Sequence, residues 1–223
     1  MDGTLVETEE LWGEAMAALA RELGGSLSPE ARERTVGTAM PVAMAVLYAD
    51  LGVHRSEEQL RADAAWVEDE TAALMATRGM PWRPGACELL IEVRAAGIAT
   101  ALVTTTPRRI ATIVLDRIAA GLGASPFDVT VCGDEVPARK PDPAPYRQAM
   151  TALGVEPGSS LVVEDSSVGV TAGLASGAAV LGVPSLQPLE PRPGLVLRAS
   201  LAGVTVHDLA GWAADRSGAT APA

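Results

Sequence analysis

The chain has little of several residue types, and each shortage narrows what the protein can be. Cysteine occurs only twice in 223 residues, at Cys87 and Cys132, so free thiols in a reducing compartment are expected rather than a disulfide or a zinc site. Basic residues number 17 against 28 acidic ones, and the net charge of −11 opposes binding to nucleic acid or to anionic membranes. No apolar run approaches the ~20 residues that span a bilayer, and the acidic N-terminus lacks a signal-peptide pattern. These shortages predict a soluble cytoplasmic protein with no nucleic-acid or membrane partner.

Hydrophobic residues make up 48% of the chain, which is enough to bury the core of one large domain or two modest ones. From residue 8 to about residue 79, apolar residues recur at three- and four-residue steps, as they do in helices. Two helix starts stand out within this segment. Ser28 precedes a proline, and Ser56 and Gln59 have the spacing of a capping box. We predict a small helical bundle here, without a strand.

Beyond residue 85 short apolar runs alternate with helical segments. Strands are predicted at 98–104, 129–132, 160–164 and 179–183, with a short edge strand at 204–206 and a Pro-rich loop at 184–194. Strands that alternate with helices favour a doubly wound parallel sheet with helices on both faces. The predicted fold is therefore α/β: a Rossmann-like core of residues 1–10 and 80–214, an inserted α-helical cap of residues 11–79, and a frayed tail, 215–223.

Ligands bind to open parallel sheets where the carboxyl ends of the strands meet. Thr104 and Thr105 follow one predicted strand, and hydroxyls and backbone amides there can hold phosphate oxygens. Threonine at such a position is more often an ordinary helix cap. Lys140 lies in a loop stiffened by proline on both sides of Asp142, and a fixed ammonium would neutralise a phosphoryl group. An isolated loop lysine is usually only solvated, so this interpretation depends on its neighbours.

Glu164 and Asp165 end another apolar strand. Two adjacent acids at the end of a buried strand are costly unless a cation lies beside them. Mg²⁺ is the natural partner because it prefers a few carboxylates together with phosphate and water oxygens. The alternative, a solvated acidic turn followed by a capped helix, is less favoured.

The N-terminal run MDGTLVETE, residues 1–9, resembles the Asp-x-Asp-Gly-Thr-Leu-Val-x-Thr-Glu signature of the haloacid dehalogenase (HAD) superfamily. Thr104, the run KPDP at 140–143 and the run EDSSVG at 164–169 are similar to the other three motifs of that family, in the same order. The resemblance covers nearly the whole chain and includes a helical cap inserted after the first motif. It points to the subgroup of β-phosphoglucomutases and phosphatases.

The resemblance implies a role for each matching residue. Asp2 is the general acid/base and offers its backbone carbonyl to Mg²⁺. Thr104, Thr105 and Lys140 bind the phosphoryl group. Glu164 and Asp165 hold the metal ion. The second Asp and the acidic pair favour phosphoryl transfer over dehalogenation, so the expected activity is Mg²⁺-dependent hydrolysis of a small phosphomonoester, such as a sugar phosphate, through an aspartyl-phosphate.

The nucleophile of the family matches the position directly ahead of Met1. We expect an apolar strand that ends in Asp to precede Met1, because the family's first strand occupies the centre of the sheet. If Met1 is the true start, the alternative is a catalytically inactive protein that binds a phosphorylated ligand.

Substrate choice is expected to come from the cap, where similar proteins turn Trp12, Arg34, Gly37 and Thr38 towards the site. A phosphomutase is the alternative enzyme. Mutase relatives place a histidine near the position of Trp12, whereas the histidines of this chain are His54 and His207. Their positions weaken the mutase interpretation without removing it.

Overall fold

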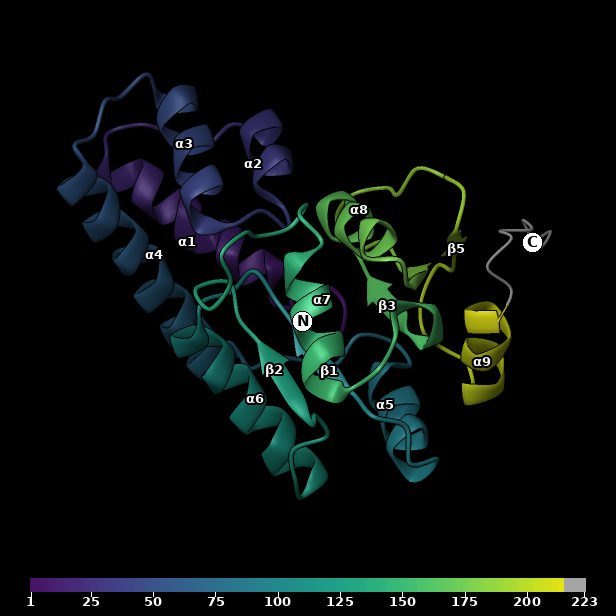
Figure 1. The fold of residues 1–223 in the computed structure, drawn as a ribbon. Helices are drawn as coiled ribbons and strands as arrows, with labels where there is room; N and C mark the ends of the chain where they lie inside the picture. Colours follow the sequence, from purple (N-terminus) through teal and green to yellow (C-terminus); the bar gives the residue numbers. More distant parts are fainter. Residues whose placement is uncertain (215–223) are drawn as a thin grey trace.

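The four N-terminal helices pack together on one side of the molecule (Figure 1). The computed structural model describes residues 1–214, and the predicted frayed tail lies outside the described residues. Both predicted caps are confirmed: Ser28 accepts a hydrogen bond from the backbone N–H of Ala31 at 3.1 Å, and Ser56 and Gln59 form a reciprocal capping box. The helices are α1 (Glu9–Glu22), α2 (Pro29–Thr35), α3 (Met40–Leu51) and α4 (Glu57–Arg78).

This helical bundle has a hydrophobic core of its own. Met44 and Leu47 of α3 and Val67 of α4 are fully buried, and they pack with Met16 and Leu19 of α1. Burying a side chain of this size contributes about 1.5–3 kcal/mol, so the bundle is held mainly by its own apolar contacts. The boundaries of cap and core stay a prediction.

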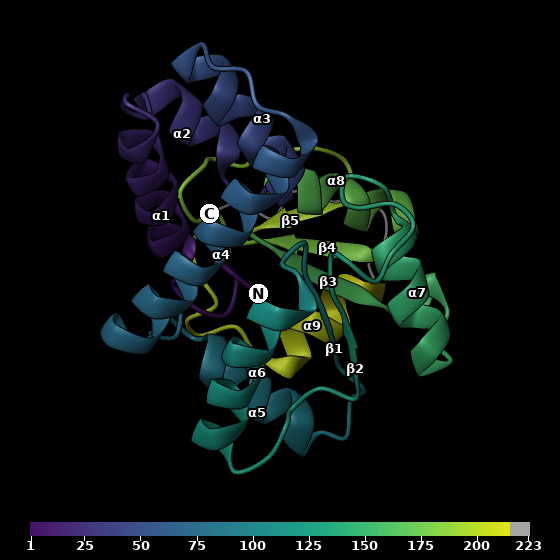
Figure 2. The ribbon, with the colours of Figure 1, turned by 90° about the vertical axis from the view of Figure 1, so that its left-hand side faces the viewer.

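From α5 (Ala86–Ala95) to β4 (Ala179–Gly182), helices and strands alternate along the chain, which confirms the predicted α/β class. Every pair of neighbouring strands is parallel, with Ala101 opposite Val129 and Leu161 opposite Ala179 (Figure 2). No helix among residues 1–214 is both long and apolar enough to cross a membrane. The elements are α5 (Ala86–Ala95), β1 (Ala101–Val103), α6 (Arg108–Leu122), β2 (Val129–Val131), α7 (Ala144–Leu153), a 3₁₀ turn (Pro157–Ser159), β3 (Leu161–Glu164), α8 (Ser167–Ser176), β4 (Ala179–Gly182), β5 (Leu195–Leu197) and α9 (Val206–Ala214).

The prediction of an edge strand at 204–206 is wrong. Val206 begins α9, and the edge strand is β5, directly after the predicted Pro-rich loop. The cause is a local cap: the carboxylate of Asp208 accepts hydrogen bonds from both the backbone N–H and the hydroxyl of Thr205, at 2.9 and 2.7 Å. The β-branched residues that suggested a strand therefore mark the start of a helix.

The strands form two separate ladders, β2–β1 and β3–β4–β5. Between them lies a cavity of about 530 Å³, which we call the interstrand cavity; it is lined by β1, β3 and apolar side chains of α5, α7 and α9. One edge of β1 and one edge of β3 have no ladder partner among the described residues. The strand expected ahead of Met1 would fit between these edges, and that expectation stays a prediction.

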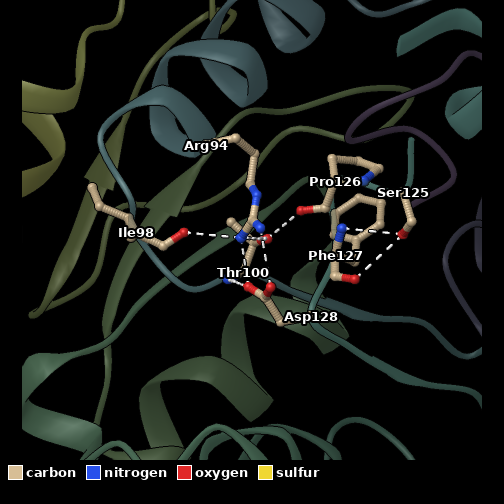
Figure 3. Close-up of polar contacts among 7 residues, drawn as sticks. All are labelled: Arg94, Ile98, Thr100, Ser125, Pro126, Phe127 and Asp128. Atoms are coloured by element: carbon tan, nitrogen blue, oxygen red, sulfur yellow. Dashed lines mark hydrogen bonds and ion pairs between the residues drawn. The ribbon is translucent and has the colours of Figure 1, made fainter. Parts of the chain in front are cut away.

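A polar cluster fixes the amino ends of β1 and β2 (Figure 3). Arg94 of α5 binds the carboxylate of Asp128 through two nitrogens, at 2.5 and 3.0 Å, and Asp128 also accepts the backbone N–H of Thr100 at 2.9 Å. The hydroxyl of Thr100 donates to the carbonyl of Pro126. The cluster joins α5 to the starts of both strands. It lies at the opposite end of these strands from Thr104, which follows the carboxyl end of β1.

Candidate active site

One pocket forms where the carboxyl ends of β1 and β3 meet the helical bundle. It has a volume of about 80 Å³ and receives side chains from both parts of the molecule. Arg34 is the one predicted site residue that does not line it, since this side chain lies on the exposed face of α2. The predicted residues that do line the pocket are Asp2, Trp12, Gly37, Thr38, Thr104, Thr105, Lys140, Glu164 and Asp165.

The carboxylate of Asp2 is held by three donors. Its Oδ1 accepts from the hydroxyl of Thr8 and, at 3.4 Å, from the indole N–H of Trp12. Its Oδ2 accepts from the hydroxyl of Thr106 at 2.7 Å. Because Trp12 belongs to α1 and Thr106 follows β1, the position of this acid depends on both the bundle and the core.

The ammonium group of Lys140 is buried beside an acid and an aromatic ring. Its Nζ donates to the carbonyl of Val103 at 3.0 Å and to Oε1 of Glu164 at 2.5 Å, and it lies 4.7 Å from the ring centroid of Tyr146. The hydroxyl of Tyr146 donates to the same Oε1. Burial raises the pKa of Glu164, but the positive charges and hydrogen-bond donors around it, chiefly Lys140, together hold that pKa below its usual value. Lys140 and Glu164 therefore form a charged pair in the wall of the pocket.

Asp165 is buried without a cationic side chain to pair with it. Its Oδ1 accepts from the hydroxyl of Thr4 at 2.6 Å, and no described side chain forms an ion pair with it. Burial, and then the charge of Glu164, raise the pKa of Asp165 from 3.8 to about 6. Gly3, at a φ of +66°, makes room for this acid, because a Cβ there would lie 2.2 Å from Oδ2.

The oxygen atoms around Asp165 fit a hard divalent cation. In the described part of the chain, neither Oδ2 of Asp165 nor the backbone oxygen of Asp2 accepts a hydrogen bond, whereas both oxygens of Glu164 already accept from side chains. Mg²⁺ keeps several waters and needs only one or two carboxylates from the protein. No group of three or more His, Cys, Asp or Glu side chains among residues 1–214 is placed to hold a metal ion, so water or substrate oxygens would complete the ligands.

The loop after β1 offers donors for an anion. Thr104 continues the parallel ladder, since its N–H donates to the carbonyl of Val131 at 3.0 Å, and its buried hydroxyl accepts the N–H of Thr106 at 3.2 Å. Helix α6 begins four residues after Thr104, so the positive end of its dipole lies near this loop. The loop can therefore hold phosphate oxygens opposite Lys140.

Comparisons with known proteins agree with this arrangement. Residues 1–183 match the family described as haloacid dehalogenase-like hydrolase. The chain belongs to the haloacid dehalogenase-like hydrolases. A phosphoglycolate phosphatase from Rhodospirillum rubrum is 32% identical over 238 residues, which cover 99% of this chain and 93% of the relative. The validoxylamine A 7'-phosphate phosphatase of Streptomyces hygroscopicus subsp. limoneus is 31% identical over 193 residues, 85% of each chain. The crystal structure of CbbY from Rhodobacter sphaeroides in complex with phosphate is similar with a TM-score of 0.79 and 28% identity, covering 94% of this chain and 96% of that one.

These findings confirm the predicted family, the α/β fold and the enzyme class, a phosphatase of the HAD type. The roles of the individual residues in this HAD-like hydrolase stay predictions.

Two further charged residues line the pocket of the HAD-like hydrolase from the bundle side. Glu9 is buried, and burial, followed by the charges of Asp2 and Asp165, raises its pKa to about 8. Arg32 of α2 donates from Nη2 to the backbone carbonyl of Glu9 at 2.6 Å. Glu9 had a signal in the sequence, because it ends the N-terminal motif. The sequence pattern does not show which of Arg32 and Arg34 faces the pocket, because both lie on the short helix α2.

Proposed function

We propose that this HAD-like hydrolase cleaves the phosphate ester of a small phosphorylated metabolite, with Mg²⁺ as its cofactor. The observation that carries the proposal is the meeting of Asp2, Lys140 and Asp165 in one small pocket beneath a helical bundle. The relatives named as phosphatases support the same reaction class. The unpaired cysteines, Cys87 and Cys132, suit a cytoplasmic location, which is part of the same proposal.

In the proposed reaction, a carboxylate directly ahead of Met1 attacks phosphorus, and the bond from phosphorus to the ester oxygen breaks. Asp2 gives its proton to the departing oxygen, and then takes a proton from the water that hydrolyses the aspartyl-phosphate. Support for this placement is that Met1 lines both the pocket and the interstrand cavity, so a residue ahead of Met1 would lie beside the pocket.

The other side chains bind and neutralise. Lys140, Thr104 and Thr105 would hold phosphoryl oxygens, and Glu164 would keep the ammonium of Lys140 in position; in support, all four line the pocket and Lys140 donates to Glu164. Asp165 and the backbone oxygen of Asp2 would hold Mg²⁺, which when bound supplies positive charge to the phosphoryl oxygens.

Phosphate release from a panel of phosphomonoesters tests the proposal. The chain extended by an apolar segment that ends in Asp should release phosphate with Mg²⁺ and not with EDTA. Asp2→Asn should lower turnover by about 10²–10⁴-fold, the range of general acid–base catalysis. Asp116→Asn, an exposed carboxylate on α6, is the matched control. Turnover that survives EDTA or Asp2→Asn would contradict the proposed roles.

A phosphomutase is the rival activity, and the pocket gives it no support. The resemblance matches the histidine of the mutase relatives to the segment of Leu11 and Trp12, and neither His54 nor His207 lines the pocket. Activation of turnover by a sugar bisphosphate would reverse this choice.

A further inference from the structure

We propose that Arg32 makes the pocket selective for phosphomonoesters whose leaving group carries a second anionic group a few atoms from the phosphate. This proposal rests on the proposed function, which puts the phosphoryl group beside Thr104 and Lys140. The new part is that Arg32, on the side of the pocket formed by the helical bundle, binds a second anionic group of the substrate.

The pocket has two cationic side chains among its described lining residues, and they differ in what surrounds them. Lys140 belongs to the core and is paired with Glu164 at 2.5 Å. Arg32 belongs to the bundle, keeps 24% of its side chain exposed, and comes no closer than 3.9 Å to the carboxylate of Glu9. Lys140 is therefore already paired with a carboxylate at hydrogen-bond distance, whereas Arg32 is not.

The guanidinium of Arg32 is held in one position by the residues that it contacts. A Cβ on Gly13, in the interior of α1, would lie 2.3 Å from its Nε, so the guanidinium rests directly on the helix. Glycine inside a helix costs about 1 kcal/mol relative to alanine, and here its lack of a side chain provides this space. The carbonyl of Glu9 accepts from Nη2 at 2.6 Å, and the hydroxyl of Thr35 accepts from Nη1 at 3.2 Å. These contacts fix the plane of the guanidinium.

The guanidinium of Arg32 has N–H groups left to donate to a ligand. Arg32 carries five N–H donors, and two of them are engaged in hydrogen bonds with described residues. A planar guanidinium matches a carboxylate or a phosphate with two parallel hydrogen bonds, which a neutral hydroxyl cannot accept in the same way. The unused N–H groups therefore favour a ligand with a second anionic group over one with only neutral hydroxyls.

The two halves of the proposed ligand site belong to one pocket. Thr104 and Lys140, which would hold the phosphoryl group, line the same pocket as Arg32. One small molecule can therefore reach both sides, and a two- or three-carbon compound with a phosphate at one end and an anion at the other is the simplest ligand of this kind.

The test compares 2-phosphoglycolate with 2-hydroxyethyl phosphate, which differ only in a carboxylate against a hydroxymethyl group. Dissociation constants for both are measured by calorimetry on the 223-residue protein with Mg²⁺. The protein should bind 2-phosphoglycolate more tightly. Arg32→Gln should reduce that preference about 10- to 100-fold, the range of a hydrogen bond to a charged group, and leave the affinity for 2-hydroxyethyl phosphate unchanged.

Gly13→Ala should reproduce the loss of preference without touching the charge, because its Cβ displaces the guanidinium. Arg21→Gln, which removes an exposed arginine of α1, is the control for net charge and should keep the preference. If Arg32→Gln fails to fold, Arg32→Lys and Gly13→Ala decide the question, and both should lower the preference.

Three results would overturn the proposal: no preference for 2-phosphoglycolate in the unaltered protein, a preference that survives loss of Arg32, or an equal weakening of both ligands. An equal weakening of both ligands would mean that Arg32 only supports the local structure around Glu9 and does not bind the second anion. Because binding is measured without turnover, the two proposals fail separately: a preference that depends on Arg32, together with no phosphate release from the chain extended by an Asp-ended segment, would refute the proposed function and leave this inference standing.

Discussion

Replacing Glu9 by glutamine should remove a large part of the pH dependence of stability. Glu9 is 6% exposed and lies among acids at the entrance to α1. Burial, followed by the charges of Asp2 and Asp165, raises its pKa from 4.5 to about 8. At neutral pH the folded protein therefore keeps a proton on Glu9 that the unfolded chain releases.

The sign follows from proton binding. Between the ordinary pKa of 4.5 and the raised value of about 8, the folded state binds more protons, so the free energy of unfolding falls as the pH rises. The contribution of Glu9 is complete below the lower value and lost above the higher one. At 1.36 kcal/mol for each pKa unit, the shift corresponds to about 5 kcal/mol. This is comparable with the whole stability of a small domain, about 5–15 kcal/mol.

Urea unfolding followed by tryptophan fluorescence, from about pH 5 to about pH 9 in EDTA, measures the effect. The unaltered protein should lose about 1.4 kcal/mol for each pH unit up to about pH 8 from this residue, on top of what Asp165 contributes. Glu9→Gln should lose much less. Glu10→Gln, at the exposed neighbouring position, is the matched control and should follow the unaltered protein. Parallel profiles for the unaltered protein and Glu9→Gln would refute the reasoning.

Other expectations follow from the same structure. Asp165→Ala should abolish Mg²⁺-dependent phosphate release in the chain extended by an Asp-ended segment, and unchanged turnover would remove Asp165 from the metal site. Because the pKa of Asp165 is raised to about 6, calorimetry should find Mg²⁺ affinity falling below about that pH, where proton and cation compete; a flat profile would argue against this ligand. Asp128→Ala should lower the urea concentration at the midpoint of unfolding, since it removes the partly exposed pair with Arg94 and the bond from Thr100; no change in urea unfolding would show that the cluster does not fix the strands. Ala149→Leu should raise the melting temperature by filling part of the interstrand cavity, and a lower value would show that this wall is already packed.

The parts of the fold that depend on local sequence could be predicted. Ser28 and Ser56 cap helices because their side chains reach backbone groups three residues away, which is visible in the spacing alone. Thr104, Glu164 and Asp165 come together because parallel strands bring their carboxyl ends to one edge. The prediction failed at 204–206, where β-branched residues suit both a strand and the cap that Asp208 provides.

The details of the site that depend on tertiary contacts could not be predicted. Tyr146 carries no signal of its contact with Glu164, because the two are 18 residues apart and meet only through the packing of α7 against the core. The choice of Arg32 over Arg34 depends on which face of α2 the bundle presents to the pocket. Gly13 carries no signal of its contact with Arg32, because only the packing of α2 against α1 brings the guanidinium beside it.

The interstrand cavity has a mechanical consequence. Unfolding removes internal voids, so hydrostatic pressure favours the unfolded state in proportion to the void volume that is lost. The interstrand cavity, of about 530 Å³, is partly open to solvent, so only the part of it that water does not fill adds to the volume lost on unfolding. The two ladders on either side of it, β2–β1 and β3–β4–β5, share no strand hydrogen bonds that would resist compression. Pressure should therefore act on the boundary between β1 and β3 before it acts on the helical bundle, whose core side chains are buried.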